Sequence, residues 1–258
     1  MIELIDQMNQ TVRLANIPSR IVSLVPSQTE LLHDLGLENE VVGITKFCIH
    51  PSEWFQTKTR IGGTKNVDIE KVRALNPDFI IGNKEENTQA DIEALMQIAP
   101  VYMSDIETLE QALEMIQQIG ICVGKSEKAK DFVQAIKTNF DSLSANKKPF
   151  TCLYFMWKDP YFTVGPKTFI HEMIEQIGGI NLQEIERYPE WDFSSNIHPD
   201  VVFLSSEPYP FKEEHIAFFQ EKYPTSKILL VDGEYFSWYG SRMLNAPAYF
   251  QTILSELR

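Results

Sequence analysis

The clearest chemical signal in this chain is a run of aromatic residues near its end. The run Tyr235–Tyr239 places four rings in five residues, and Arg242 follows shortly after. Rings beside a guanidinium suit a large, flat, partly apolar anionic ligand, which they bind by stacking and charge pairing. Tyr235, Trp238 and Arg242 are therefore predicted to bind a ligand. The alternative is that the rings form a small core beneath the last helix.

Two further features could contribute to binding. One is a second group of rings, from which Phe162 is a predicted ligand contact; the group comprises Tyr154, Phe155, Trp157, Tyr161, Phe162, Tyr188 and Trp191. The other is the predicted helix start at Ser27, whose free backbone amides could hold a negative group. An ordinary helix cap explains Ser27 equally well.

Catalytic fingerprints do not occur in the sequence. The patterns GxGxxG, GxxxxGK[ST], GxSxG and HExxH are missing, and the five histidines are scattered. Three cysteines without paired spacing are typical of buried apolar residues rather than of a metal site. We therefore expect a binding protein without a catalytic cofactor. An enzyme would need converging titratable groups, for which Glu234, His50 and Glu207 are the candidates.

Charge excludes several classes of partner. The chain has 23 basic and 36 acidic residues, so its net charge is 23 − 36 = −13. Nucleic acids and anionic membrane surfaces need a basic face, and both are therefore disfavoured. No apolar run is long enough to span a membrane. The first residues do not resemble a signal peptide, which predicts a cytoplasmic protein as the sequence is written, or a periplasmic or surface-anchored one if a leader was removed.

The elements that must position these residues alternate between strand and helix. The apolar run Arg20–Val25 is typical of a strand buried on both faces, and Ser27–Glu30 predicts a capping box for the next helix. The opening residues predict a hairpin. We expect the Tyr235–Tyr239 run to lie in a loop beyond the carboxyl end of a strand at Ile228–Val231, which is where open α/β sheets bind ligands. Further strands are predicted at 41–45, 79–82, 101–103, 151–157 and 201–204, and helices at 69–75, 91–98, 109–120, 167–177, 213–222 and 241–257.

The pattern restarts after one long helix, predicted at Ser126–Ser144. The sequence Asn-Pro-Asp78 precedes one predicted strand, and His-Pro-Asp200 precedes another in the second half. We therefore predict an α/β fold of two Rossmann-like lobes joined by one long helix, with a ligand cleft between the lobes. The predicted domains are residues 1–122, a connecting helix at 123–147, and residues 148–258.

The chain resembles a known family over nearly its whole length. Several segments are similar to those of class III substrate-binding proteins. In the first half they are Arg20–Glu30, Val42–Ile44, Gly62–Gly63 with Val67–Glu70, and Leu75–Asp78. In the second half they are Phe162–Gly165, Ile177–Asn181 and Trp238–Arg242. These helical-backbone metal receptors capture cobalamin, ferric siderophores or haem for ABC importers. The resemblance is strongest to the cobalamin receptors.

The resemblance implies a non-catalytic solute-binding protein and a set of residues that line its pocket: Phe47, His50, Thr64, Asn83, Phe162, Tyr188, Glu234 and Trp238. His50 could ligate a corrinoid cobalt or a haem iron from one face. Thr64 and Asn83 stand where a cobalamin receptor has tryptophan, which leaves a corrinoid precursor or an iron chelate open.

Receptors of this family dock on their importer through one acid in each lobe. The first acid corresponds to Glu70, and the second falls near Ser194 and Ser195, which carry no acid. Two alternatives remain open: a cytoplasmic cofactor scavenger or chaperone of the same fold, and an enzyme of the chelatase-like α/β type.

Overall fold

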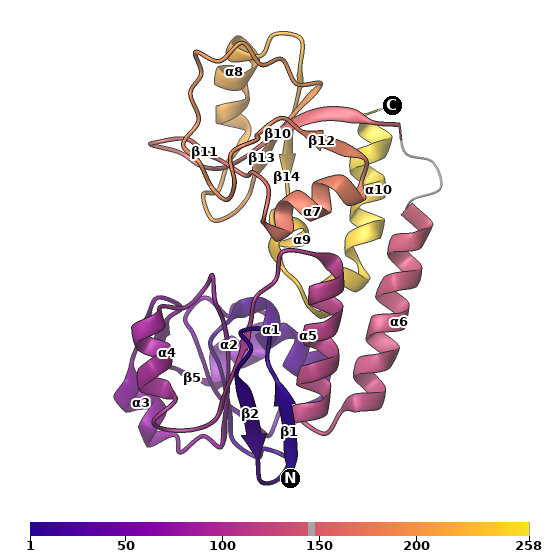
Figure 1. Ribbon diagram of the computed structural model, residues 1–258. Helices are drawn as coiled ribbons and strands as arrows, with labels where there is room; N and C mark the ends of the chain where they lie inside the picture. Colours follow the sequence, from indigo (N-terminus) through magenta and orange to yellow (C-terminus); the bar gives the residue numbers. More distant parts are fainter. Residues whose placement is uncertain (144–147, 258) are drawn as a thin grey trace. The chain divides into compact units, whose positions relative to one another are not determined.

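The computed structural model describes residues 1–143 and 148–257 (Figure 1). Contacts between Cα atoms divide the chain into two compact units. The first unit comprises Met1–Ile106, Glu110–Ala135 and Tyr239–Arg242, and the second comprises Glu107–Leu109, Ile136–Trp238 and Met243–Arg258. Of the predicted connecting segment at 123–147, residues 144–147 lie outside the described part of the chain.

The first unit is built on a parallel sheet in the order β5-β4-β3-β8-β9. Apolar residues dominate its strands, and those of β3 and β8 are buried on both faces, as expected for a covered parallel sheet. The strands predicted for this half are confirmed, although β3 is shorter than expected and β5 was not predicted. The strands are β3 (Ile21–Ser23), β4 (Val41–Ile44), β5 (Thr59–Arg60), β8 (Phe79–Asn83) and β9 (Val101–Ser104).

Two hairpins, five helices and the first part of α6 (Ser126–Leu143) also belong to the described part of the first unit. The predicted opening hairpin is confirmed as β1 (Ile2–Ile5) and β2 (Thr11–Leu14), and a second, unpredicted hairpin consists of β6 (Gly62–Gly63) and β7 (Asn66–Val67). The helices are α1 (Pro26–Asp34), α2 (Ser52–Thr57), α3 (Ile69–Ala74), α4 (Gln89–Leu95) and α5 (Leu109–Cys122). Helix α2 was not predicted.

The predicted capping box at Ser27–Glu30 is wrong. Helix α1 begins at Pro26, and its N-cap residue Val25 makes no side-chain cap. Proline is well suited to the first helical position because its fixed φ is helical and its missing N–H would be unpaired there. Ser27 and Glu30 therefore lie inside the helix, and Glu30 is available for another contact.

The second unit contains a sheet in the order β11-β10-β13-β14, with β12 also paired to β10. Its strands are parallel except for β11, which is antiparallel to β10. The predicted strands are confirmed, and the short strands β11 and β12 are additions. The strands are β10 (Phe150–Trp157), β11 (Phe162–Thr163), β12 (Gly179–Asn181), β13 (Val201–Ser205) and β14 (Lys227–Val231).

The helices of the second half differ from expectation only near its end. Helices α7 (Phe169–Gln176) and α8 (Glu213–Lys222) confirm the prediction, as does the long helix α6 (Ser126–Leu143), although Ser144 lies outside the described residues. The last predicted helix is interrupted: a 3₁₀ turn, η2 (Ser241–Leu244), precedes α10 (Ala246–Glu256). Residues predicted as a loop form the one-turn helix α9 (Glu234–Ser237).

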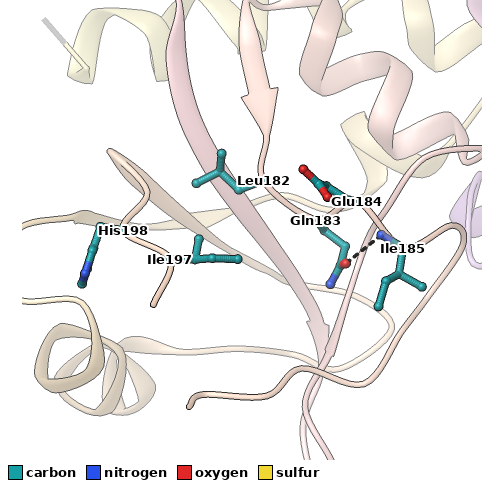
Figure 2. Close-up of a pocket in the computed structure, with 6 residues that line it drawn as sticks. All are labelled: Leu182, Gln183, Glu184, Ile185, Ile197 and His198. Atoms are coloured by element: carbon teal, nitrogen blue, oxygen red, sulfur yellow. Dashed lines mark hydrogen bonds between the residues drawn. The ribbon is translucent and has the colours of Figure 1, made fainter. Parts of the chain in front are cut away.

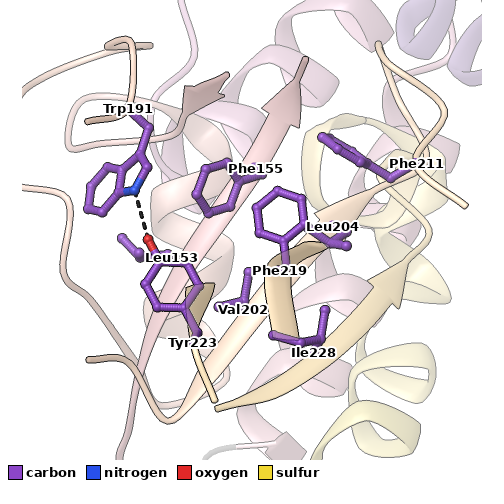
Figure 3. Packing of buried hydrophobic residues seen from close by; sticks show 9 residues of the cluster. All are labelled: Leu153, Phe155, Trp191, Val202, Leu204, Phe211, Phe219, Tyr223 and Ile228. Carbon is purple, nitrogen blue, oxygen red and sulfur yellow. Dashed lines mark hydrogen bonds between the residues drawn. The ribbon is translucent and has the colours of Figure 1, made fainter. Parts of the chain in front are cut away.

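Aromatic residues build much of the core of the second unit (Figure 3). Phe155 is fully buried, with ring centres 4.7 Å from Phe219 and 6.0 Å from Trp191. The indole Nε1 of Trp191 donates a hydrogen bond of 2.7 Å to the hydroxyl of Tyr223, so the polar end of this buried ring is satisfied. Several rings that suggested ligand binding in the sequence therefore hold the fold instead.

The repeated Pro-Asp sequence makes the same kind of contact in both units. The carboxylate of Asp78 accepts hydrogen bonds from the backbone N–H and hydroxyl of Ser19 and from the N–H of Arg20, at 2.8–2.9 Å. The carboxylate of Asp200 accepts from the N–H and hydroxyl of Thr151 at 2.7 and 2.8 Å. Each of these Pro-Asp contacts ties the start of one parallel strand to the start of its neighbour.

Candidate ligand site

Two segments meet at the carboxyl end of the second sheet. Strands β13 and β14 are paired in parallel, with Ser205 opposite Val231. Glu207 follows the end of β13, and α9 follows the end of β14. Because parallel strands end at the same edge, this topology brings Glu207 and the aromatic run together.

Glu207 holds the end of α9 through one carboxylate oxygen. Its Oε1 accepts a hydrogen bond of 3.1 Å from the indole Nε1 of Trp238, and another from the hydroxyl of Ser237. Trp238 is 7% exposed. The indole is therefore fixed by a charge-assisted hydrogen bond, which is stronger than one between neutral groups.

Two other rings of the run pack against the last helix. Phe236 is fully buried and lies 4.9 Å from Phe250 of α10, measured between ring centres. Tyr235 stacks on Tyr249 of the same helix at 4.5 Å and 18°. The alternative of a small core beneath the last helix therefore describes Phe236 and Tyr235, whereas Trp238 contacts Glu207.

Three other predicted residues of the second unit are half-buried. Phe162 lies in β11 and forms an isolated bridge with Glu190. Tyr188 faces the guanidinium of Arg187, which lies 5.7 Å from the ring centre. The backbone N–H of Glu234 donates to a carboxylate oxygen of Asp232 at 3.1 Å, at the start of α9.

Arg242 belongs to the first unit and is paired there with an acid of α1. Its Nε and one terminal nitrogen donate to the two carboxylate oxygens of Glu30, at 2.9 and 2.7 Å. Both side chains are largely buried, at 15% and 18% exposed. The expectation that Arg242 pairs with an anionic ligand is weakened, because its charge is neutralised by Glu30.

The predicted residues of the first unit lie at or beyond the carboxyl ends of its strands. Phe47 is half exposed, and the Lys46 ammonium lies 5.0 Å from its ring centre. A hydrogen-bond chain joins Thr64 to Asn83: Asn87 Nδ2 donates to the carbonyl of Thr64, and Asn87 Oδ1 accepts from the N–H of Asn83, each at 2.9 Å. His50 is half-buried and precedes α2.

Asn83 has little left to offer a ligand. Its side-chain amide donates to the hydroxyl and carbonyl of Ser104, and its carbonyl accepts from the N–H groups of Glu85 and Glu86. The residue is 2% exposed. It therefore shapes the loop after β8.

Glu86 was missed by the sequence analysis. Burial raises its pKa, the neighbouring charge of Glu85 raises it further, and Lys65 opposes the shift. A carboxyl group beyond the end of β8 is thus more easily protonated than usual.

Glu207 was considered only as a catalytic candidate, because no local signal in the sequence connects it to Trp238.

One pocket in the second unit has a volume of about 450 Å³ (Figure 2). Its lining residues are Leu182, Gln183, Glu184, Ile185, Ile197 and His198. The amide of Gln183 bonds internally, to the hydroxyl of Thr163 and to the N–H of Ile185. None of the predicted ligand residues lines this pocket. Within residues 1–143 and 148–257, no group of three or more His, Cys, Asp or Glu residues could hold a metal ion.

A family model described as periplasmic binding protein matches residues 21–225. The chain belongs to this family. The family consists of binding proteins, in agreement with the expectation of a non-catalytic binder and with the resemblance to class III substrate-binding proteins.

Individual relatives are similar to this chain over much of its length. It is 30% identical over 188 residues to the uncharacterized ABC transporter substrate-binding lipoprotein YvrC of Bacillus subtilis, covering 68% of this chain but only 59% of that relative. It is 26% identical over 205 residues to the vitamin B12-binding protein of Vibrio parahaemolyticus, covering 74% and 73% of the two chains.

A solved structure supports the predicted fold. The petrobactin-binding protein YclQ of Bacillus subtilis superposes with a TM-score of 0.80 at 18% identity, covering 100% of this chain and 98% of the other. This likeness and the two parallel sheets confirm the predicted α/β class with Rossmann-like lobes. No helix in the described ranges combines the length and hydrophobicity that crossing a membrane requires.

Proposed function

We propose that this protein is the solute-binding component of an ABC importer and captures a corrinoid. The observation that carries the proposal is the match of residues 21–225 to periplasmic binding proteins. The relatives YvrC and the vitamin B12-binding protein, named as a transporter lipoprotein and a corrinoid binder, support the same function. Neither supports the cytoplasmic location expected from the first residues. We therefore place the protein outside the cytoplasmic membrane.

The charges of the molecule favour a neutral or cationic ligand. The net charge is −13, and Arg242 is paired with Glu30. An anionic ligand would approach against this field and would not gain the guanidinium predicted for it. Ferric siderophores and haem, which commonly carry anionic groups, are thus less well matched than a corrinoid.

The proposed binding residues lie at the carboxyl ends of the two sheets. In the second unit Trp238 is the main ring, with Phe162, Tyr188, Glu234 and Tyr235 around the same sheet. In the first unit Phe47 is the main ring, and His50 is a proposed axial ligand to cobalt. Thr64 is proposed to line the site without stacking, and Asn83 to shape the loop beside it; neither supplies a ring, which favours a smaller corrinoid such as cobinamide over cobalamin.

A ligand titration tests the proposal directly. The protein is titrated with cobinamide, cobalamin, haemin and ferric siderophores, following absorbance and tryptophan fluorescence. We expect cobinamide or cobalamin to bind most tightly, with a change in the cobalt absorbance spectrum if His50 is a ligand. Tightest binding of haemin or a ferric siderophore would overturn the corrinoid assignment, and no binding by any of them would overturn the function.

The Trp238→Ala substitution tests the site. It should weaken binding by about 1–3 kcal/mol, because a stacked aromatic ring at a ligand site contributes about that much. Phe218→Ala is the matched control, since this ring of α8 packs against Tyr161 at 5.3 Å. Equal losses of affinity in both variants would indicate that Trp238 serves packing alone.

Importer docking is proposed to use Glu70 of α3. Its side chain is 81% exposed, and Arg73 lies 3.5 Å away. Near the position of the second expected acid, the carboxylate of Asp192 accepts hydrogen bonds from the N–H and hydroxyl of Ser194. Stimulation of the importer ATPase should fall in Glu70→Gln and less in Asp192→Asn. A full response in Glu70→Gln would exclude this docking residue.

A further inference from the structure

We propose that Glu207 is a positioning residue, whose carboxylate sets the orientation in which the indole of Trp238 meets the ligand. This inference rests on the proposed function, in which Trp238 contacts the guest. The decisive contact is the hydrogen bond of 3.1 Å from Trp238 Nε1 to Glu207 Oε1. A ring that stacks on a ligand gains most when its plane is fixed before binding, because no rotational freedom is then lost.

The same carboxylate oxygen holds two consecutive residues. Ser237 donates its hydroxyl to Glu207 Oε1, and Trp238 donates its indole N–H to that atom. Ser237 is the last residue of α9, and Trp238 is its C-cap in an extended conformation. Glu207 thereby fixes both the end of the helix and the direction in which the indole leaves it.

Glu207 is itself fixed from the core of the sheet. Ser205 donates its hydroxyl to the backbone carbonyl of Glu207 at 2.7 Å, and the hydroxyl of the fully buried Tyr154 donates to Ser205 Oγ at 2.9 Å. Hydrogen bonds on the backbone and on the side chain of Glu207 therefore link a buried tyrosine of β10 to the indole of Trp238 through this one residue. Such a path is the support that a binding residue needs to keep one rotamer.

The backbone at Gly233 approaches Glu207 closely. A Cβ atom at Gly233 would lie 2.7 Å from Glu207 Cγ and 2.3 Å from Ser205 Oγ. Glycine is required here for close approach, since the φ of Gly233 is −62° and suits any residue. The loop after β14 thus packs directly on the stem of Glu207.

A double-mutant cycle between Glu207 and Trp238 tests the proposal in the full-length protein. Glu207→Ala should weaken binding of the corrinoid, cobinamide or cobalamin, by about tenfold, because the freed indole must then be ordered when the ligand binds. Glu207→Gln should recover most of the affinity, because its amide oxygen can still accept from the indole. In Trp238→Phe, which keeps a ring but lacks the N–H, the change Glu207→Ala should have little further effect.

A spectroscopic measurement separates positioning from general support of the fold. The indole N–H resonance of Trp238, assigned by its loss in Trp238→Phe, should move and exchange faster with solvent in Glu207→Ala, and should return toward its original position in Glu207→Gln. If the alanine variant does not fold, Glu207→Met fills the same space without accepting the hydrogen bond and replaces it in the cycle.

Four further outcomes would overturn the positioning role of Glu207. An unmoved indole resonance, or an equal loss of affinity in the Trp238→Phe background, would overturn the proposal while the proposed function stands. Unchanged affinity in Trp238→Ala, with a corrinoid still bound, would do the same by placing Trp238 away from the guest. Failure of every compound in the titration would overturn the proposed function and this inference together.

Discussion

The two sheets are alike where their strands begin and differ where their strands end. At the amino ends, Asp78 ties β8 to the segment before β3, and Asp200 ties β13 to β10, in both cases through backbone N–H and hydroxyl donors. At the carboxyl ends, the first sheet carries an amide and hydroxyl network around Asn83 and Ser104, whereas the second carries Glu207 and Trp238.

This difference separates what the fold needs from what the site needs. A contact that recurs in both halves at equivalent strands serves the assembly of a parallel sheet, whatever the ligand. The carboxyl ends of the two sheets differ in chemistry and can be adapted to a ligand, as in α/β proteins generally. The cores diverge as well: β3 and β8 bury mainly aliphatic residues, whereas the second unit surrounds Phe155 with rings.

The largest expected effect comes from the aromatic core. Phe155→Ala should lower the free energy of unfolding by about 3–5 kcal/mol, because it leaves a cavity among four neighbouring rings: those of Tyr161, Trp191, Phe193 and Phe219. Ile81→Ala, at an equally buried position of β8, should cost about 2–4 kcal/mol. Denaturant unfolding of both variants measures the difference. A smaller loss for Phe155 would mean that its neighbours collapse into the space.

The next effect concerns the ion pair between Arg242 and Glu30. Arg242→Ala should cost about 2–4 kcal/mol of stability, because it leaves the carboxylate of Glu30 largely buried without its partner. The double variant Glu30→Ala with Arg242→Ala should lose less than the sum of the single losses. Thermal unfolding measures both. If corrinoid binding weakens in a well-folded Arg242→Ala protein, the guanidinium serves the ligand after all.

The two Pro-Asp contacts should each be worth about 1–2 kcal/mol, the usual range for a carboxylate that accepts backbone hydrogen bonds. Asp78→Ala and Asp200→Ala should therefore destabilise the protein similarly, and Asp131→Ala on the exposed face of α6 is the control. Unequal losses would break the proposed equivalence of the two sheets.

The contact of Asp200 also has a predictable pH dependence. Hydrogen bonds from the N–H and hydroxyl of Thr151 lower the pKa of Asp200 below its ordinary value of 3.8. The carboxylate therefore stabilises the fold fully above that value, and the stabilisation is lost as the pH falls through the lowered pKa. The difference in stability between the native protein and Asp200→Ala should be constant near neutral pH and shrink in acid.

Local patterns predicted the strands and most helices, whereas contacts over long sequence distances could not be predicted. Short apolar runs marked β3 and β8 because a covered parallel strand must be apolar on both faces. The capping box failed because Pro26 takes the first helical position. The partner of Arg242 lies 212 residues earlier, and that of Trp238 lies 31 residues earlier, so only the assembled sheets reveal either pair.

The smallest effect should come from Glu86, the acid that follows β8. Burial and the charge of Glu85 raise its pKa above the ordinary value of 4.5. The fold thus favours the protonated form, and the stability gained from that form is lost as the pH rises from the ordinary value through the raised one. Glu86→Gln, which is neutral at every pH, should raise the melting temperature at pH 7.5 and change it little at pH 4.

Glu221→Gln, on the exposed part of α8, is the control for removing one negative charge from an acidic protein. An equal gain in that variant would assign the effect to the net charge. A gain in melting temperature confined to Glu86→Gln would show that the acid at the carboxyl end of the first sheet lowers stability. The acid at the end of the second sheet, Glu207, instead accepts two hydrogen bonds and supports its neighbours. The two sheet ends would then differ in the function of their acids as well as in their residues.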